Sequence, residues 1–209
     1  MKRFFFIALA ATSLFSCEEK LKTPEVTDKK KKSVEKLIIK ESSSVDMHSR
    51  SNFSEARTKH IHLDLNVNFN KQIISGVARH EIDNIKQVEE IIFDSKSLDI
   101  DKITLGKDEE TLTTFSLMDY DELLGEALKV KINADSKFVN IYYSTTKDTE
   151  ALGWMSPENT DGKKHPFLFT QGQAILTRTW IPCQDTPGNR ITYSADINVP
   201  SELMAVMSS

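Results

Sequence analysis

Two glutamines separated by one glycine, Gln171, Gly172 and Gln173, are the residues whose types and spacing best suit a binding site. If the backbone is extended there, both glutamine side chains point to the same side. The glycine has no Cβ, so another backbone or a ligand can approach closely. A primary amide accepts a hydrogen bond from an ammonium group through its carbonyl oxygen without adding a charge. The segment is therefore a candidate binding site, and the alternative is a polar hairpin with solvated glutamines.

The residues that follow this segment predict the turn that would hold it in place. Pro182 and Pro187 bracket a short polar stretch and favour a turn there. Arg178 and Asp185 are the nearest candidates for an ion pair that would fix this turn.

Several sequence runs, in the same order, carry a resemblance to a known family. They are Gly153-Trp-Met-Ser-Pro-Glu-Asn-Thr160, Pro166-Phe-Leu-Phe-Thr-Gln-Gly-Gln-Ala174, Arg178, Pro182-Cys-Gln-Asp-Thr-Pro187 and Tyr193-Ser-Ala-Asp-Ile-Asn-Val-Pro200. The sequence resembles the N-terminal domain of the gluzincin zinc aminopeptidases, and within them the leukotriene hydrolase and aminopeptidase B branch. The resemblance is densest from Trp154 to Ser209 and continues, more weakly, back to about Lys59.

The resemblance implies roles for the residues of the glutamine segment. In the family, a Thr-Gln-x-Gln/Glu-Ala segment reaches into the cleft of the zinc domain, and its second Gln or Glu helps to hold the free α-amine of the peptide. That role falls on Gln173, with Ala174 and Gln171 lining the same pocket. The resemblance also implies that four further residues are structural, namely Arg178, Pro182, Asp185 and Pro187.

The zinc chemistry of the family has no counterpart in this sequence. The family's metal site is a His-Glu-x-x-His helix with a distant Glu, and only His80-Glu81 begins that pattern, with Asn84 where the second histidine would stand. The Gly-x-Met-Glu-Asn segment of the family is also absent. The resemblance therefore implies that zinc is bound by a catalytic domain missing from this chain, which is expected to be inactive alone. The expected partners are that domain and the N-terminus of a peptide.

The first residues of the chain predict an export signal. Met1-Lys-Arg precedes an apolar stretch from Phe4 to Cys17, which is too short to span a bilayer and is typical of a secretion signal. Leu14-Phe-Ser-Cys17 resembles a bacterial lipobox, which predicts that Cys17 is lipidated and that the protein is anchored in the bacterial envelope, on the periplasmic or surface face of the outer membrane. Ordinary signal cleavage is the alternative.

Composition predicts one folded domain after a tail. The chain has 209 residues and a net charge of −4, without the basic excess of a nucleic-acid-binding protein. Residues 18–57 are polar, contain a run of four lysines from Lys29 to Lys32, and predict a disordered linker. Residues 58–209 are expected to form the domain.

Alternating polar and apolar residues predict an all-β sandwich or saddle-shaped sheet, the fold that the resemblance also implies. Strands are expected at 60–69, 73–84, 90–94, 98–105, 128–132, 138–143 and 192–199, with a bulge tolerated at Gly76. His60 and His62 fall on a polar strand face, where their spacing could hold a metal or simply leave them in solvent. We expect Trp154 and Trp180 to pack the glutamine segment rather than touch a substrate.

The final residues predict a further strand. Glu202 to Met207 is expected to begin it, which would leave the domain C-terminally incomplete. We therefore expect an N-terminal fragment of a larger zinc aminopeptidase. A lesser alternative within that class is epoxide hydrolysis, and the competing class is a non-enzymatic surface lipoprotein that keeps only the β-domain as a binding module.

Overall fold

The computed structural model describes residues 46–208. Cys17, the predicted signal sequence and most of the predicted linker lie outside these residues. Within 46–208, no helix has the length and apolar character needed to cross a membrane.

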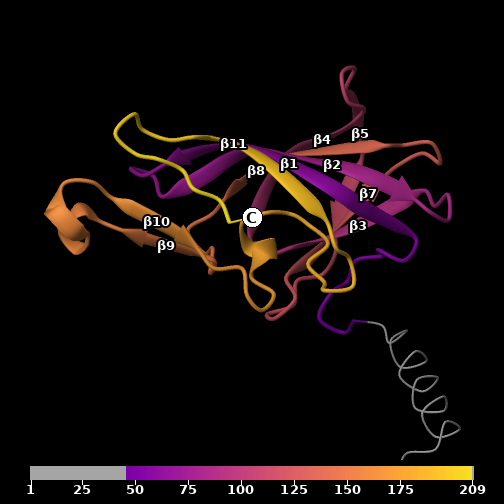
Figure 1. Cartoon of the computed structure of the whole chain (residues 1–209). Coiled ribbons are helices and arrows are strands. Elements are labelled where there is room, and N and C mark those ends of the chain that lie inside the picture. The colour runs from indigo at the N-terminus through magenta and orange to yellow at the C-terminus, as the bar shows by residue number, and fades with distance from the viewer. Residues whose placement is uncertain (1–45, 209) are drawn as a thin grey trace, which may run out of the picture. The chain divides into compact units, whose positions relative to one another are not determined.

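The largest sheet has six strands, in the spatial order β11-β1-β2-β8-β4-β5 (Figure 1). Neighbouring strands are antiparallel except β1 and β11, which run parallel. The strands are β1 (Ala56–Asn68), β2 (Ile73–Asn84), β4 (Leu98–Leu105), β5 (Thr111–Thr113), β8 (Phe138–Thr145) and β11 (Thr192–Asn198).

Two smaller sheets and three short 3-10 helices complete the described structure, which confirms the all-β prediction. One sheet has the order β3-β7-β6 and the other pairs β9 with β10. The elements are β3 (Glu90–Ser95), β6 (Phe115–Leu117), β7 (Glu126–Lys131), β9 (Leu152–Met155), β10 (Phe167–Thr170), η1 (Pro157–Asn159), η2 (Asp161–Lys163) and η3 (Thr177–Thr179). The sequence patterns predicted neither β5 and β6 nor β9 and β10.

Apolar and polar residues alternate along β1, and the apolar ones define the buried face of the large sheet. Ile61, Leu63 and Leu65 have between 1% and 4% of their surface exposed, and they pack against Trp180 beside η3. A second apolar cluster contains Val139 and Ile141 of β8 and lies against the β3-β7 pair. Each buried aliphatic side chain contributes about 1.5–3 kcal/mol through removal from water. The first cluster, which contains Trp180 and Ile181, therefore stabilises the position of the segment after β10.

Gly76 does not form a bulge, because β2 pairs in unbroken register with both of its neighbours there. The register shifts lie instead at Thr58/His60 and Ile100/Lys102. A Cβ on Gly76 would lie 2.0 Å from the Asp64 carbonyl oxygen, and its φ is +154°. The glycine is therefore needed because β1 and β2 approach closely there, and not because β2 contains the extra residue of a bulge.

The predicted strand from Glu202 to Met207 is wrong. A turn closed by Leu203 N donating to Pro200 O is followed by residues without regular structure. Met204 and Val206 are more than 80% exposed there. These apolar side chains suggested a strand, but no neighbouring strand pairs with their backbone.

The folded part starts before the predicted boundary at residue 58. Arg50 N donates to Asp94 Oδ1 (2.8 Å), and Asn52 exchanges hydrogen bonds with Glu90 O and Ile92 N. Ser49, Arg50 and Asn52 are polar residues that hydrogen-bond to β3, and composition alone cannot distinguish such residues from solvated ones.

Candidate functional site

The glutamine segment forms the connection between β10 and η3. Gln171 N donates to Ala151 O (2.8 Å), after which the chain leaves the sheet and turns through residues 173–176. Leu176 N donates to Gly172 O (2.8 Å) and closes this turn. The backbone is therefore not extended through Gln173, and the expectation that both glutamines share one strand face does not apply.

Gln171, Gln173 and Ala174 are all exposed. The loop that carries them is nevertheless tightly held at its glycine, because a Cβ on Gly172 would lie 2.5 Å from Thr177 Oγ1. The group that approaches this glycine is therefore the side chain of the first residue of η3. The three exposed side chains can contact a ligand or another domain.

The buried side chain of Arg178 holds the residues that follow the glutamine segment in place. Its side chain is completely buried, and its Nε lies 3.2 Å from Asp185 Oδ2, so the predicted ion pair is present. The remaining guanidinium donors reach backbone oxygens of other segments, Leu124 O (3.2 Å), Asp185 O (3.1 Å) and His48 O (2.7 Å). One arginine therefore connects η3, the turn after it, the β6–β7 connection and the residues before β1.

Asp94 is the second acid of this network and was missed as a partner of Arg178. Its Oδ1 lies 3.6 Å from Arg178 Nη1, and its oxygens accept from Ser49 Oγ (2.6 Å), Arg50 N (2.8 Å) and Asp185 N (3.0 Å). Burial raises the pKa of the Asp94 carboxyl, which the Ser49 hydrogen bond and the Arg178 charge oppose. The sequence places Asp94 at a strand end among other acids, where nothing indicates a distant arginine.

Gln184 is a buried structural residue that sequence reasoning also missed. Its amide nitrogen donates to Ala56 O (2.9 Å) and its oxygen accepts from Thr58 N (2.9 Å). Next to it, Cys183 exchanges backbone hydrogen bonds with Asp94. These contacts bind the segment after η3 to β1 through the Gln184 side chain and to β3 through one isolated backbone bridge.

The two prolines that were predicted to be structural differ in burial. Pro182 is buried beneath the turn, whereas Pro187 is exposed. Trp180 is only 8% exposed, and Trp154 packs edge-on against Phe69 with ring centroids 5.4 Å apart. Trp180 belongs to the apolar cluster on the buried face of β1, and Trp154 packs against that cluster.

A hollow of about 580 Å³ adjoins the glutamine loop. Thr170, Ala174 and Thr177 line it from the loop side, and Asp185 and Pro187 line it from the turn. Ala174 is thus the predicted site residue that borders a cavity.

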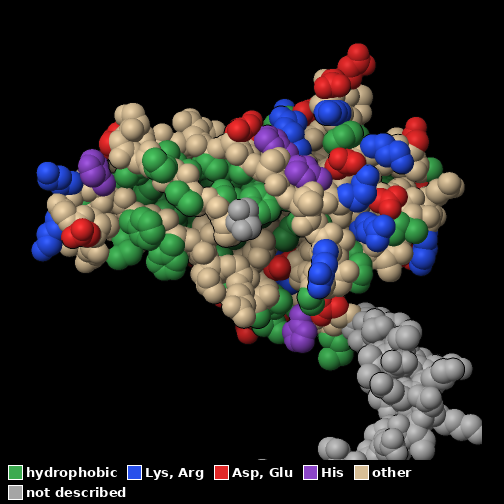
Figure 2. All heavy atoms as spheres, viewed as in Figure 1, with side chains coloured by type: hydrophobic (Ala, Val, Ile, Leu, Met, Phe, Trp, Pro, Cys, Tyr) green, Lys and Arg blue, Asp and Glu red, His purple; other side chains and the backbone are tan. Residues whose placement is uncertain are grey.

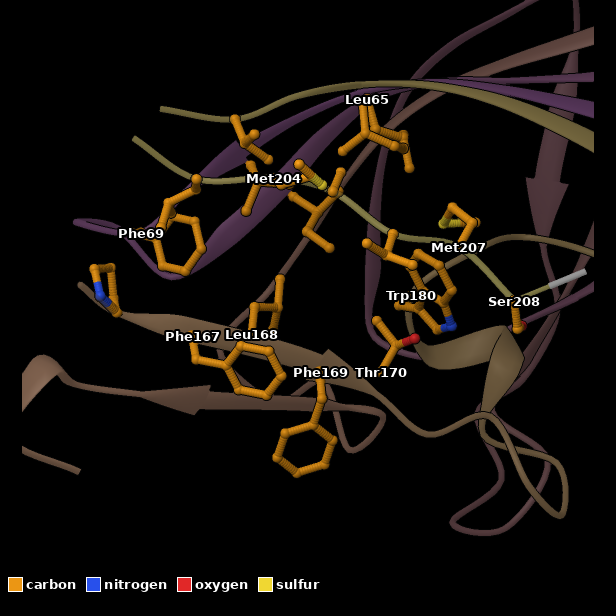
Figure 3. A pocket seen from close by; sticks show the side chains of 18 residues that line it. Leu65, Phe69, Phe167, Leu168, Phe169, Thr170, Trp180, Met204, Met207 and Ser208 are labelled. Carbon is orange, nitrogen blue, oxygen red and sulfur yellow. The ribbon is translucent and has the colours of Figure 1, made fainter. Parts of the chain in front are cut away.

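A second hollow of about 440 Å³ lies between β1, β10 and the C-terminal segment. Figure 3 shows Leu65 and Met204 on one side of this space and Leu168 on the opposite side, with Trp180 at one end. Its lining is largely apolar, and Phe167 at its edge is 52% exposed. The glutamine loop therefore lies beside surface that suits contact with apolar groups.

The His80-Glu81 pair does not fit a zinc site. His80 is fully buried on β2, where its Nδ1 lies 3.1 Å from Thr58 Oγ1 and its ring packs on Phe93. Burial lowers the pKa of His80 to about 3. Glu81 points to the surface and pairs with Lys59 at 2.7 Å. Across residues 46–208, no three His, Cys, Asp or Glu side chains are arranged to hold a metal ion.

Comparison with known proteins identifies the class. Residues 57–209 match the Peptidase M1 N-terminal domain, and the chain belongs to this family. Within it, the chain falls in the branch of the leukotriene A-4 hydrolases and leucine aminopeptidase 2. Members of the M1 family are zinc metallopeptidases.

Individual relatives show how much of such a protein this chain represents. It is 37% identical to leucine aminopeptidase 2 of Sclerotinia sclerotiorum over 77% of this chain and 27% of that protein. It is 36% identical to leukotriene A-4 hydrolase of Xenopus laevis over 72% of this chain and 25% of that protein. The structure of yeast LTA4 hydrolase in complex with bestatin matches with a TM-score of 0.70 and 30% identity, over 79% of this chain and 26% of that one. The chain spans about a quarter of the length of these relatives.

Proposed function

We propose that this chain is the substrate-amine-binding β-domain of a zinc aminopeptidase that removes N-terminal residues from peptides. The observation that carries the proposal is the exposed loop of Gln171, Gln173 and Ala174, held by the buried Arg178 network, in a chain of the M1 N-terminal family. The zinc ion belongs to the part of such a protein that this chain does not contain.

In this proposal Gln173 orients the peptide rather than reacting with it. Its side-chain oxygen accepts a hydrogen bond from the free α-ammonium group and leaves neutralisation of that charge to carboxylates elsewhere. Gln171 and Ala174 complete the wall of the same pocket. A positioned amine fixes the distance from the peptide's N-terminus to the scissile bond, and this selects exopeptidase cleavage.

Rigidity of the loop is the contribution that the fold makes. Arg178 is fixed by two carboxylates and three backbone oxygens, and the turn of residues 173–176 directly precedes η3, the element that contains Arg178. A loop held in this way loses little conformational freedom when the substrate binds, so more of the hydrogen-bond energy remains for orientation.

We further propose that the protein is anchored in the bacterial envelope through a lipid on Cys17. The basic residues before the apolar stretch and the Leu14-Phe-Ser-Cys17 run support this proposal. Growth with a radiolabelled fatty acid tests it. Label on the wild-type protein and none on Cys17→Ser is the expected result, and equal labelling would contradict it.

Activity measured on two lengths of the protein tests the proposed class. We expect the 209-residue chain to leave aminoacyl reporter peptides intact, because its described residues hold no catalytic metal group. A longer product of the same gene, read in frame beyond the codon for Ser209, is expected to contain Gly-x-Met-Glu-Asn and His-Glu-x-x-His and to hydrolyse these peptides. Hydrolysis by the short chain would overturn the division of roles, and a stop codon after Ser209 would favour a binding module.

A further inference from the structure

The outer face of the β1–β11 pair carries a row of polar side chains that the proposed function does not use. The two strands are parallel, with His60 opposite Thr192 and His62 opposite Ser194. Asp196 continues the row on β11. Figure 2 shows histidine side chains next to one another over this part of the sheet, within reach of solvent. His62 is 33% exposed and Asp196 is 82% exposed.

One nitrogen of each imidazole points to the same place. His60 Nε2 lies 3.0 Å from Ser194 Oγ, and His62 Nδ1 lies 2.8 Å from the same oxygen. Residues two apart on a strand project from one face, and the parallel partner holds the serine between the two rings. Ser194 Oγ can donate to only one of these nitrogens and accepts from the other, so the two nitrogens both offer lone pairs to one ion when the donating imidazole carries its proton on its other nitrogen. Two convergent imidazole nitrogens of that kind can chelate a metal ion.

The other nitrogen of each ring has its own polar partner. His60 Nδ1 lies 2.8 Å from Thr192 Oγ1, and His62 Nε2 lies 3.5 Å from Asp196 Oδ2. A carboxylate beside one ring nitrogen favours the N–H at that position and leaves the lone pair on the opposite nitrogen, as in most histidine ligands of metals. The Asp196 carboxylate therefore favours the His62 tautomer whose Nδ1 lone pair faces Ser194.

We propose that His60 and His62 together bind a first-row transition-metal dication on the outer face of the sheet. Imidazole nitrogen suits Cu²⁺, Ni²⁺ and Zn²⁺, at a bond length of about 2.1 Å for zinc. Because no third His, Cys, Asp or Glu of residues 46–208 completes the group, water and the Ser194 hydroxyl take the remaining coordination positions. The Irving–Williams order then makes Cu²⁺ the tightest of the three ions.

The two histidines lie on β1, and through the Ser194 hydroxyl the bound ion would also contact β11, the strand at the edge of the large sheet. An ion that binds only the folded chain stabilises it in proportion to the logarithm of its concentration over the dissociation constant. The site therefore makes attachment of the edge strand sensitive to the supply of a transition metal.

Calorimetric titration of the 209-residue chain with CuCl₂ tests the proposal, with MgCl₂ as the oxygen-preferring comparison. The variants are His60→Gln, His62→Gln and Asp196→Asn, and the matched control is His165→Gln at an exposed histidine outside the row. We expect about one Cu²⁺ per wild-type chain at this site, at least tenfold weaker binding in either histidine variant, and about tenfold weaker binding in Asp196→Asn. Cys17 is the same in every protein, so its contribution cancels in the comparison.

Thermal unfolding provides a second readout. Cu²⁺ is expected to raise the Tm of wild type and of His165→Gln, and to raise it less in His60→Gln and His62→Gln. Equal copper affinity in wild type and both histidine variants would overturn the proposal. So would binding of Mg²⁺ as tight as that of Cu²⁺, because the site would then be a carboxylate site.

Discussion

Replacement of Arg178 by methionine is expected to lower the free energy of unfolding of the 209-residue chain by about 3–5 kcal/mol. Methionine keeps much of the side-chain length but provides no hydrogen-bond donor. Asp94 then remains buried, 1% exposed, without its cation, and the oxygens of His48, Leu124 and Asp185 lose their donors. Urea denaturation followed by circular dichroism measures the change.

Two further variants separate this mechanism from a general effect of losing an arginine. Arg57 is 49% exposed and pairs with Asp83 at 3.3 Å, so Arg57→Met is expected to cost less than about 1 kcal/mol. Adding Asp94→Asn to Arg178→Met removes the unpaired charge and should recover part of the loss. A cost of Arg178→Met no larger than that of Arg57→Met would show that the buried network does not stabilise the fold.

Stability is expected to fall steeply in acid because of His80. Its pKa in the folded chain is about 3 because burial disfavours the charged ring, whereas a solvated histidine has a pKa of about 6.5. Below about pH 6.5 the His80 side chain binds a proton in the unfolded chain but not in the folded chain. The contribution of His80 is therefore complete above that pH and is lost at about 1.4 kcal/mol per pH unit as the pH falls toward 3.

Urea denaturation at several values between pH 7.5 and pH 4.5 measures this dependence. In His80→Gln the proton-linked part disappears, so the stability difference between wild type and variant should shrink by roughly 2–3 kcal/mol over that range. His165→Gln, at an exposed position, is expected to keep the wild-type dependence. Parallel curves for wild type and His80→Gln would contradict the assignment of the buried neutral histidine.

The fold followed from local alternation where a strand has one buried face. β2 and β4 begin and end at the predicted residues, and Ile61, Leu63 and Leu65 of β1 face the core as their spacing indicates. The three-residue strands β5 and β6 and the hairpin of β9 and β10 give no such pattern. In β9 every residue is half-buried, because the hairpin packs on the core with only part of each side chain. β9 therefore lacks the alternation of buried and exposed residues from which a strand is predicted.

The candidate site was predictable in its residues but not in its geometry. Gln171 and Gln173 could be chosen by residue type, but the chain turns at the second glutamine. The turn depends on the close approach of Thr177 to Gly172 and on the hydrogen bond from Leu176 N to Gly172 O. The Arg178–Asp185 pair could be predicted from the sequence because only seven positions separate the two residues. Asp94 and His48 are 84 and 130 positions away from Arg178, and nothing local in the sequence marks such partners.

Kinetics of Gln173→Ala in the proposed longer, zinc-containing product of the gene test the central claim most directly. The substrates are peptides with a free or an acetylated N-terminus, and Gln87→Ala, at an exposed turn between β2 and β3, is the control. Loss of a hydrogen bond to a charged group is worth about 1.5–3 kcal/mol, so kcat/KM for the free peptide should fall about tenfold to a hundredfold, with zinc content and the slow reaction of the acetylated peptide unchanged. Unaltered kcat/KM in Gln173→Ala would show that this loop does not hold the substrate amine.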